Sequence, residues 1–256
     1  MKKLLIAFAL TNALFSCKKE KTNTNSTTNS SNGVTCVDNP NINFTAIGTP
    51  VGKFSDCIKD VDGNVYKTVN IGNQTWMAEN LKTSKYNDGT PIQNVKDSLV
   101  WSKLTTGAWC YYNNDEKNNS KYGKLYNWYS VNSTSNGNKN VCPTGWHVPT
   151  NSEWTILTDF LGGDSVAGGK MKEIGVLNWS NLNVGATNTS LFTSIASGVN
   201  FFSFKFKNQG VFFWSKDENT NQNHLAWNIS LGFNGAYVDL DDQPKVSGFS
   251  IRCLKD

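Results

Sequence analysis

Alternation of apolar and polar positions predicts most of the strands in this chain. Residues 65–69 alternate directly after Asp62-Gly63, a dipeptide typical of hairpin turns, and residues 74–78 resume the pattern after Gly72-Asn73. The second half of the chain holds the remaining predicted strands, at residues 211–215, 224–231, 236–240 and 248–254. Polar connections rich in Asn and Gly separate them.

One helix is predicted by both its start and its periodicity. Thr150 and Glu153 have the spacing of a capping box, in which each side chain satisfies a free amide of the first turn. Trp154, Leu157 and Leu161 follow at helical intervals. Gly162-Gly163 then ends the helix.

Two further helices are predicted from periodicity alone. Residues 122–131 place Leu125, Trp128 and Tyr129 on one stripe, which is more typical of a core helix than of a ligand platform. Residues 169–174 predict a short helix with Met171 and Ile174 facing inward. Helices followed by an antiparallel sheet favour an α+β fold with about three helices. Loops as long as those left over are usually functional.

The first residues carry a signal for export. Lys2 and Lys3 precede an apolar run at residues 4–14 that is too short to span a bilayer. The run ends in Leu14-Phe15-Ser16-Cys17, which resembles the lipobox of bacterial lipoproteins, with Phe15 bulkier than usual. The resemblance implies a signal peptide at residues 1–16 and acylation of Cys17, which would anchor the chain to a membrane. An ordinary signal peptide with a chance Cys at its end is the alternative.

The chain divides into four segments on this interpretation. After the signal peptide, residues 17–35 are polar and predict a disordered tether, because they offer almost nothing apolar to bury. Residues 36–59 form a lead-in, and residues 60–256 form one domain. We expect a lipoprotein of the bacterial outer membrane, and the charged residues 18–21 resemble signals for surface exposure.

Charge argues against a nucleic-acid partner. The formal net charge is +4, but the five Lys and one Glu of residues 1–21 account for all of it. The rest of the chain is neutral overall and has no net field to attract phosphate backbones. Only 17% of residues are charged while 12% are aromatic, which suits neutral ligands.

Several motifs together resemble the Fibrobacter succinogenes major paralogous domain. They occur in order at residues 68–81, 86–92, 109–115, 122–129, 142–150, 167–173 and 248–253. That family occurs on exported and lipid-anchored bacterial proteins, and its molecular function is largely unassigned. More distantly, the family resembles the C-type-lectin-like fold of the formylglycine-generating enzymes, which implies a twisted antiparallel sheet, flanking helices and long loops.

The resemblance also implies a disulfide pairing. Export places the cysteines in an oxidising compartment, where pairing is expected. Lectin-like domains bridge a Cys in the chain to one near the end, which implies Cys142 with Cys253. Cys36 and Cys57 are then paired with each other, and Cys110 is left free. The sequence holds no CxxC pair and no Cys/His cluster, which argues against zinc.

A non-catalytic binding or adhesion module is the function favoured at this stage. Its ligand would be a carbohydrate or an envelope protein. Trp179 and Trp214 are candidates to stack on a sugar, and Asn200 and Asn234 are candidates to hydrogen-bond to it, although each has a structural interpretation. A purely structural or assembly role in the envelope is the alternative.

Calcium is a weak candidate cofactor, and no other cofactor is expected. Asp239, Asp241 and Asp242 are the only candidate ligands, and solvated side chains at a strand end explain them equally well. A lectin-type calcium site needs EPN and WND triplets. This chain has only Trp227-Asn228-Ile229 and no EPN.

Catalysis is not expected. Enzymes of the formylglycine-generating type hold copper with two cysteines near the last strand, whereas Cys253 has no second Cys within the preceding hundred residues. His147 and His224 lie far apart, without a nucleophile motif beside either. A structural role is the default for His147.

Overall fold

The computed structural model describes residues 28–29, 35–36, 49–132 and 135–256. Cys17 and the predicted signal peptide lie outside these residues. Within the segment predicted as a tether and at its end, β1 (Thr28–Asn29) pairs with β2 (Thr35–Cys36) in a two-stranded ladder. Backbone pairing of this kind needs no buried apolar side chain.

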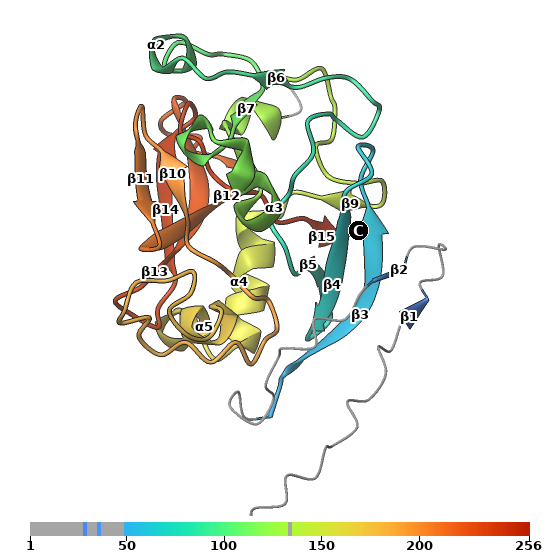
Figure 1. The fold of residues 1–256 in the computed structure, drawn as a ribbon, viewed down its shortest axis with the longest axis vertical. Helices are drawn as coiled ribbons and strands as arrows, with labels where there is room; N and C mark the ends of the chain where they lie inside the picture. Colours follow the sequence, from blue (N-terminus) through green and yellow to red (C-terminus); the bar gives the residue numbers. More distant parts are fainter. Residues whose placement is uncertain (1–27, 30–34, 37–48, 133–134) are drawn as a thin grey trace, which may run out of the picture.

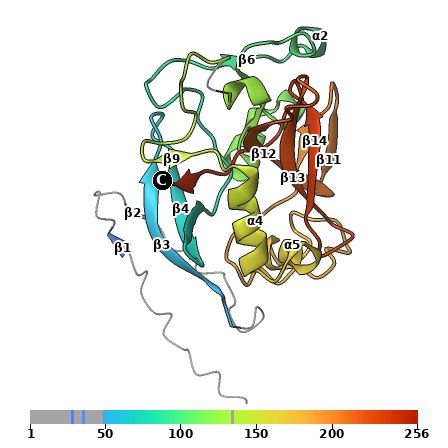
Figure 2. The ribbon, with the colours of Figure 1, turned by 180° about the vertical axis from the view of Figure 1, so that it is seen from behind.

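Two five-stranded sheets form the body of the domain (Figures 1 and 2). The first has the order β3-β4-β5-β15-β9, with β3 at Gly52–Lys59, β4 at Val65–Ile71, β5 at Gln74–Met77, β9 at Trp146–His147 and β15 at Leu254–Lys255. The second has the order β11-β10-β12-β13-β14, with β10 at Ser197–Asn200, β11 at Phe204–Lys207, β12 at Gly210–Glu218, β13 at Leu225–Gly232 and β14 at Asp239–Pro244. The α+β class is confirmed.

Smaller elements complete the fold. A three-stranded sheet contains β6 (Gln93–Asn94), β7 (Ala108–Cys110) and β8 (Leu125–Tyr126). The α-helices are α2 (Ser98–Trp101), α3 (Asn119–Tyr122), α4 (Asn151–Phe160) and α5 (Asp164–Met171). Short 3-10 turns lie at Tyr112–Asn114, Glu116–Asn118 and Trp128–Ser130.

Helix α4 joins the two large sheets, and it lies between them in Figure 1. Its Trp154 lies 4.6 Å from Trp76 of β5 and 5.9 Å from Phe213 of β12, measured between ring centroids. The predicted capping box is confirmed: the Thr150 hydroxyl accepts from the Glu153 amide, and the Glu153 carboxylate accepts from the Thr150 amide. A local sequence signal thus fixes the start of the element that links the two sheets.

One helix prediction is wrong, and another is confirmed only in part, by α5 and the buried Met171. Residues 122–131 form β8 and a 3-10 turn instead, because Gly123 has a φ of 72° and Tyr126 pairs with Phe249. Leu125 and Trp128 are nevertheless buried, as predicted. The helix expected at residues 169–174 begins earlier, as α5, and Ile174 is 36% exposed rather than inward.

Close packing explains why α5 tolerates two glycines. A Cβ on Gly168 would lie 2.2 Å from the carbonyl oxygen of Tyr237, and one on Gly169 would lie 2.3 Å from that of Gly185. These glycines let the helix approach the backbone of two neighbouring loops. The sequence pattern places Gly169 at the start of the helix, whereas both glycines lie inside α5.

The strand predictions are mostly confirmed, with three differences. The pattern does not predict β3, β6, β7, β9, β10 or β11. The strand expected at residues 236–240 is displaced to β14, and only Leu254 of residues 248–254 belongs to a strand. Residues 248–250 instead form single bridges, with Asn200, Tyr126 and Phe213. This segment contacts several elements at once and therefore does not extend along one of them.

The disulfide between Cys142 and Cys253 is confirmed, with Cα atoms 5.9 Å apart. It joins the residues that precede β9 and β15, which are neighbours in the first sheet. Cys57 is also disulfide-bonded, whereas the side chain of its predicted partner, Cys36, lies outside the described residues. Cys110 is free and buried. None of the described helices is long and apolar enough to cross a membrane.

Candidate functional site

A shallow groove with aromatic walls lies on the second sheet, and we call it the aromatic groove. It has a volume of about 240 Å³. Its lining consists of aromatic rings, amides, a hydroxyl, a carboxylate and two glycines: Phe206, Gln209, Gly210, Phe212, Ser230, Leu231, Gly232, Phe233, Asn234 and Asp239.

Strand register explains why the sheet is hollow at this point. Gly210 of β12 lies opposite Gly232 of β13, so that no side chain stands on the sheet there. The next pair on the same face is Phe212 with Ser230, and Ser230 in turn faces Asp239 of β14. The result is a bare backbone floor bordered by a ring, a hydroxyl and a carboxylate.

The rings of the groove belong to a larger aromatic cluster. Phe206 and Phe212 have centroids 6.2 Å apart, and Phe201 lies 6.4 Å from Phe206 and 5.9 Å from Phe212. Phe212 also packs on buried Phe249 at 5.1 Å. Phe206 is 43% exposed, so this cluster extends from the core to the solvent.

Backbone strain accompanies the exposed ring. Phe206 has a φ of 61°, a left-handed conformation that costs a bulky L-residue about 1–2 kcal/mol. Phe202 and Asn208, on the same hairpin, also have positive φ values of 61° and 63°. Strain of this kind persists at sites where it positions a functional side chain, so it marks Phe206 as a candidate binding residue.

Polar atoms in the groove are available to a ligand. Among the described residues, the side chains of Gln209, Ser230 and Asp239 form no intramolecular hydrogen bond, and Asn234 accepts only a long 3.4 Å bond from Tyr237. Burial and the neighbouring Asp241 raise the pKa of Asp239. Because Asp239 is the only charged residue in the lining, the groove suits a neutral ligand with hydroxyl groups.

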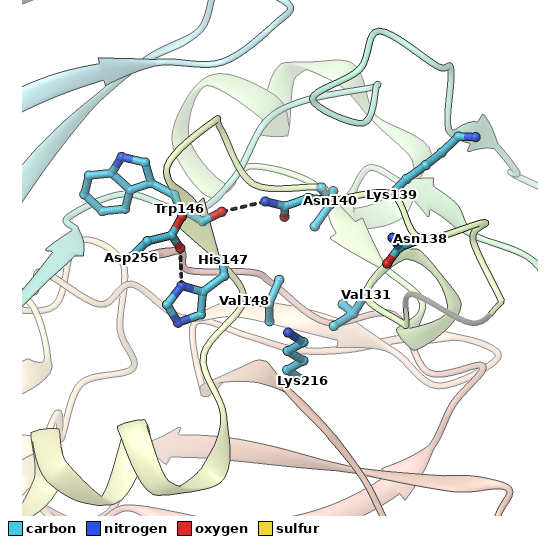
Figure 3. Close-up of a pocket in the computed structure, with 10 residues that line it drawn as sticks. Val131, Asn138, Lys139, Asn140, Trp146, His147, Val148, Lys216 and Asp256 are labelled. Carbon is cyan, nitrogen blue, oxygen red and sulfur yellow. Dashed lines mark hydrogen bonds and ion pairs between the residues drawn. The ribbon is translucent and has the colours of Figure 1, made fainter.

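A second cavity, the polar cleft, lies beside β9 (Figure 3). It has a volume of about 280 Å³ and is lined by Val131, Asn138, Lys139, Asn140, Val141, Trp146, His147, Val148, Lys216 and Asp256. His147 Nδ1 lies 2.6 Å from Asp256 Oδ1, and Nε2 lies 2.9 Å from Glu153 Oε1. With a carboxylate on each ring nitrogen, His147 has neither nitrogen available to take a proton from a substrate.

Glu153, which pairs with His147 of the cleft, lies in the first turn of α4. Burial acts to raise its pKa, but hydrogen bonds from Thr150 and His147 outweigh burial and lower it. The carboxylate is therefore held in its charged form by the helix cap and the imidazole. This arrangement explains His147 as a structural residue.

A third cavity, of about 370 Å³, lies over β3 and β4. Its lining includes Ser55, Asp56, Thr68 and Asn70, and no exposed aromatic ring. The hydroxyls of Ser55 and Thr68 bond to each other at 2.9 Å. This cavity thus offers fewer unpaired groups to a ligand than the aromatic groove does.

The prediction that Trp179, Trp214 and Asn200 contact a sugar is wrong, because all three side chains are buried. Trp179 is 1% exposed and donates to the Ser194 carbonyl, while Trp214 is fully buried and donates to the Tyr126 carbonyl. Asn200 is 6% exposed and donates to the Cys110 sulfur. Aromatic and amide side chains satisfied inside the core cannot face a ligand, and only Asn234 is exposed, in the aromatic groove.

The candidate calcium ligands do not converge. Asp239 and Asp241 lie two residues apart on β14 and therefore share one face of the sheet. Asp242 lies on the opposite face, where its carboxylate accepts a hydrogen bond from the Asn219 side chain. Asp241 accepts from Gln243 and from the amide of Asp242. Within the described residues, no group of three or more His, Cys, Asp or Glu is placed to hold a metal ion.

The sequence did not single out Phe206, Gln209, Phe212 or Ser230. One signal for Phe206 was present: Phe204 and Phe206 alternate with Lys205 and Lys207 in a strand that is otherwise polar. Large aromatic residues on a strand that is solvated on both sides are unusual. The alternation of Phe and Lys does not reveal how β11, β12 and β13 are arranged in the sheet, and that arrangement forms the groove.

Comparison with known proteins gives one match. No curated protein and no solved structure matches the chain. The model of the Fibrobacter succinogenes major domain matches residues 69–255. This range covers the whole second sheet, the aromatic groove and the Cys142–Cys253 disulfide, but it leaves out β3 and the start of β4 in the first sheet. The chain therefore belongs to the Fibrobacter succinogenes major domain family.

Proposed function

We propose that this protein is an outer-membrane lipoprotein that displays a non-catalytic, glycan-binding domain at the cell envelope. Acylation of Cys17 would anchor it, and the polar chain that follows would separate the domain from the membrane. The observation that carries the binding proposal is the aromatic groove, in which rings and unpaired polar side chains occur together. Mass spectrometry of the mature chain tests the anchor directly.

The chemistry of the groove suits a neutral sugar. The apolar face of a pyranose ring packs on an aromatic ring, as Phe206 and Phe212 allow, while its hydroxyls both donate and accept hydrogen bonds. Gln209 and Asn234 can do both, and Asp239 accepts. The groove is smaller than the roughly 300–1,000 Å³ usual for drug-sized ligands, so we propose that it binds one unit of a longer chain.

The proposal includes a C-type-lectin-like architecture without a calcium site. Support for the architecture comes from the two largely antiparallel sheets, in which only β10 and β12 pair in parallel, from the loop-rich segments, and from the disulfide beside β9 and β15. Without the EPN triplet, and with the aspartates of β14 divided between two faces, we expect binding to be independent of calcium. A chelator should therefore leave glycan binding unchanged.

Three observations support a non-catalytic role. Cys253 is bonded to Cys142, so it is not available to form the bis-thiolate copper site of formylglycine-generating enzymes. His147 is held by a carboxylate on each ring nitrogen. Cys110, the free thiol among the described residues, is buried, and burial raises its pKa to about 12, which keeps it protonated and unreactive.

A glycan array with matched variants tests the binding site. Phe206→Ala should lower affinity for the bound glycan about tenfold, because stacking on an aromatic ring contributes about 1 kcal/mol or more. Phe160→Ala is the control, since Phe160 is similarly exposed, at 52%, but lies on α4. Gly210→Val should abolish binding by filling the floor.

A role in envelope assembly is the alternative, and the glycan array together with a pull-down distinguishes it from glycan binding. If the array detects no glycan while a pull-down from envelope extract captures one partner through the groove, the groove serves protein assembly. Equal loss of glycan binding in Phe160→Ala and Phe206→Ala would contradict the proposed location.

A further inference from the structure

Residues 174–184, which follow α5, expose their apolar side chains to solvent. We call this set the aliphatic face. It consists of Ile174 (36% exposed), Val176 (54%), Leu177 (77%), Leu182 (66%) and Val184 (42%). Single exposed apolar residues are common on protein surfaces, whereas a continuous set within eleven residues indicates an interaction surface.

Three polar or aromatic side chains of the same loop face inward, whereas Ser180 is half-buried and Asn181 is exposed. Asn178 is 4% exposed, Trp179 is 1% exposed and Asn183 is 7% exposed. The usual distribution of a surface loop is therefore reversed. Because a loop gains stability by exposing amides and burying leucines, the reversal indicates selection for outward aliphatic groups rather than for stability.

Buried contacts hold the loop in this conformation. Asn183 Nδ2 donates to the carbonyl oxygens of Glu173 at 2.8 Å and of Gly175 at 2.7 Å. Lys172 Nζ donates to the Val184 carbonyl at 2.9 Å and lies 5.3 Å from the Trp179 ring. A loop ordered in advance loses little conformational entropy when its aliphatic face binds a partner.

The path of the chain indicates which partner. Val51 and Gly52, where the chain enters β3, donate to the carbonyl of Thr189, at 2.8 and 3.2 Å, shortly after the loop. The start of β3 and helix α5 lie at the same end of the molecule, opposite α2 (Figure 1). Only the 33 residues between Cys17 and Val51 separate this end from the proposed lipid anchor.

We propose that the aliphatic face docks on the membrane to which Cys17 is anchored, with Leu177 and Leu182 inserted at the boundary between headgroups and acyl chains. The inference rests on the proposed lipoprotein anchor. Because the acylated Cys17 would already hold the domain at the membrane, docking of the aliphatic face is an intramolecular step. A weak affinity of this face for lipid is therefore sufficient for docking. Val184 also donates to the Phe233 carbonyl at 2.8 Å, so docking holds the aromatic groove near the membrane and selects a membrane-proximal glycan.

Vesicle binding tests this inference without the anchor. The chain from residue 17 with Cys17→Ser is mixed with phosphatidylcholine vesicles, so that neither acylation nor lipid charge contributes. Leu177→Asn with Leu182→Asn should weaken partitioning about tenfold or more, because two exposed leucines no longer transfer to lipid. Leu99→Asn is the matched control, since Leu99 is 73% exposed on α2 at the opposite end of the molecule.

Amide hydrogen exchange provides a second measurement. The acylated chain on vesicles should exchange more slowly at residues 174–184 than the Cys17→Ser chain does in solution, with no difference at residues 97–102. Soluble-glycan affinity should be equal in the wild type and the double variant, which separates this inference from the proposed binding function. Unchanged partitioning in the double variant, an equal loss in Leu99→Asn, or a dimer that the double variant disrupts would overturn it.

Discussion

Arg252 is a buried cation that connects three parts of the fold. Its guanidinium is 1% exposed and donates to Asn80 Oδ1 at 2.7 Å and to the carbonyl oxygens of Met77 (3.0 Å), Phe192 (2.7 Å) and Thr193 (3.2 Å). The loop it binds has positive φ values at Leu191 and Thr193, 58° and 53°. One side chain thus holds a strained loop against the first sheet.

Replacing Arg252 should be strongly destabilising. Arg252→Met removes the donor from four acceptors, three of them in buried bonds, and we expect the free energy of unfolding to fall by about 3 kcal/mol or more. Urea unfolding followed by tryptophan fluorescence measures the change. A loss below about 1 kcal/mol would show that the loop is held by other contacts.

Asp62 should make stability depend on pH. Burial acts to raise its pKa, but hydrogen bonds from Ser84 and the ion pair with Lys85 outweigh burial and lower it from 3.8 to about 2. A lowered folded pKa means that the carboxylate stabilises the fold above pH 3.8 and that this contribution is lost as the pH falls towards 2.

Asp62→Asn tests this linkage. At pH 7 the variant should be less stable than the wild type by about 1–2 kcal/mol, and the difference should nearly vanish at a pH of about 2. Unfolding curves at the two pH values give the comparison. A difference that is the same at both would mean that Asp62 acts through hydrogen-bond geometry alone.

At the scale of the element, the first turn of α4 is predictable and testable. Thr150→Ala removes the hydroxyl that caps the Glu153 amide and should cost about 1 kcal/mol of stability. Thr155→Ala, on the exposed side of the same helix, should change stability little. Thermal melts of the two variants check the prediction, which fails if they are equally stable.

The disulfide should stabilise the first sheet as a unit. Its cysteines are separated by 111 residues in the sequence, and removing such a link typically costs about 2–5 kcal/mol. The double variant Cys142→Ala with Cys253→Ala should therefore unfold at clearly lower urea concentration. Equal midpoints for this variant and the wild type would contradict the role assigned to the bond.

How much the sequence could predict depended on how local each feature is. The capping box and the stripe of Trp154 and Leu157 lie within one turn or two, so α4 was predicted correctly. Residues 122–131 have helical spacing, yet Tyr126 pairs with Phe249, which lies more than a hundred residues away. Periodicity carries no information about such a partner.

The candidate site shows the same limit. Residue type alone selects Asn234 together with Trp179, Trp214 and Asn200, and the last three are buried. The floor of the aromatic groove exists because Gly210 lies opposite Gly232, which only the register of β12 and β13 determines. Residue types indicated which side chains could bind a ligand, whereas strand pairing determined which of those side chains are exposed.

At the scale of the whole molecule, charge and architecture favour a neutral ligand. The chain after residue 21 has no net charge, and the aromatic groove has one carboxylate and no cation in its lining. The first sheet brings β3 and β15 together, so the start and end of the domain belong to one layer. The second sheet carries the aromatic groove on a rigid surface.

An amide NMR titration with the glycan identified on the array tests the central claim most directly. If the aromatic groove is the binding site, the largest shifts will occur at Gly210, Ser230, Gly232 and Phe233, and the signals of the polar cleft at Asn140 and His147 will stay unchanged. Shifts centred on the polar cleft, or shifts that persist at full size in Gly210→Val, would contradict the account.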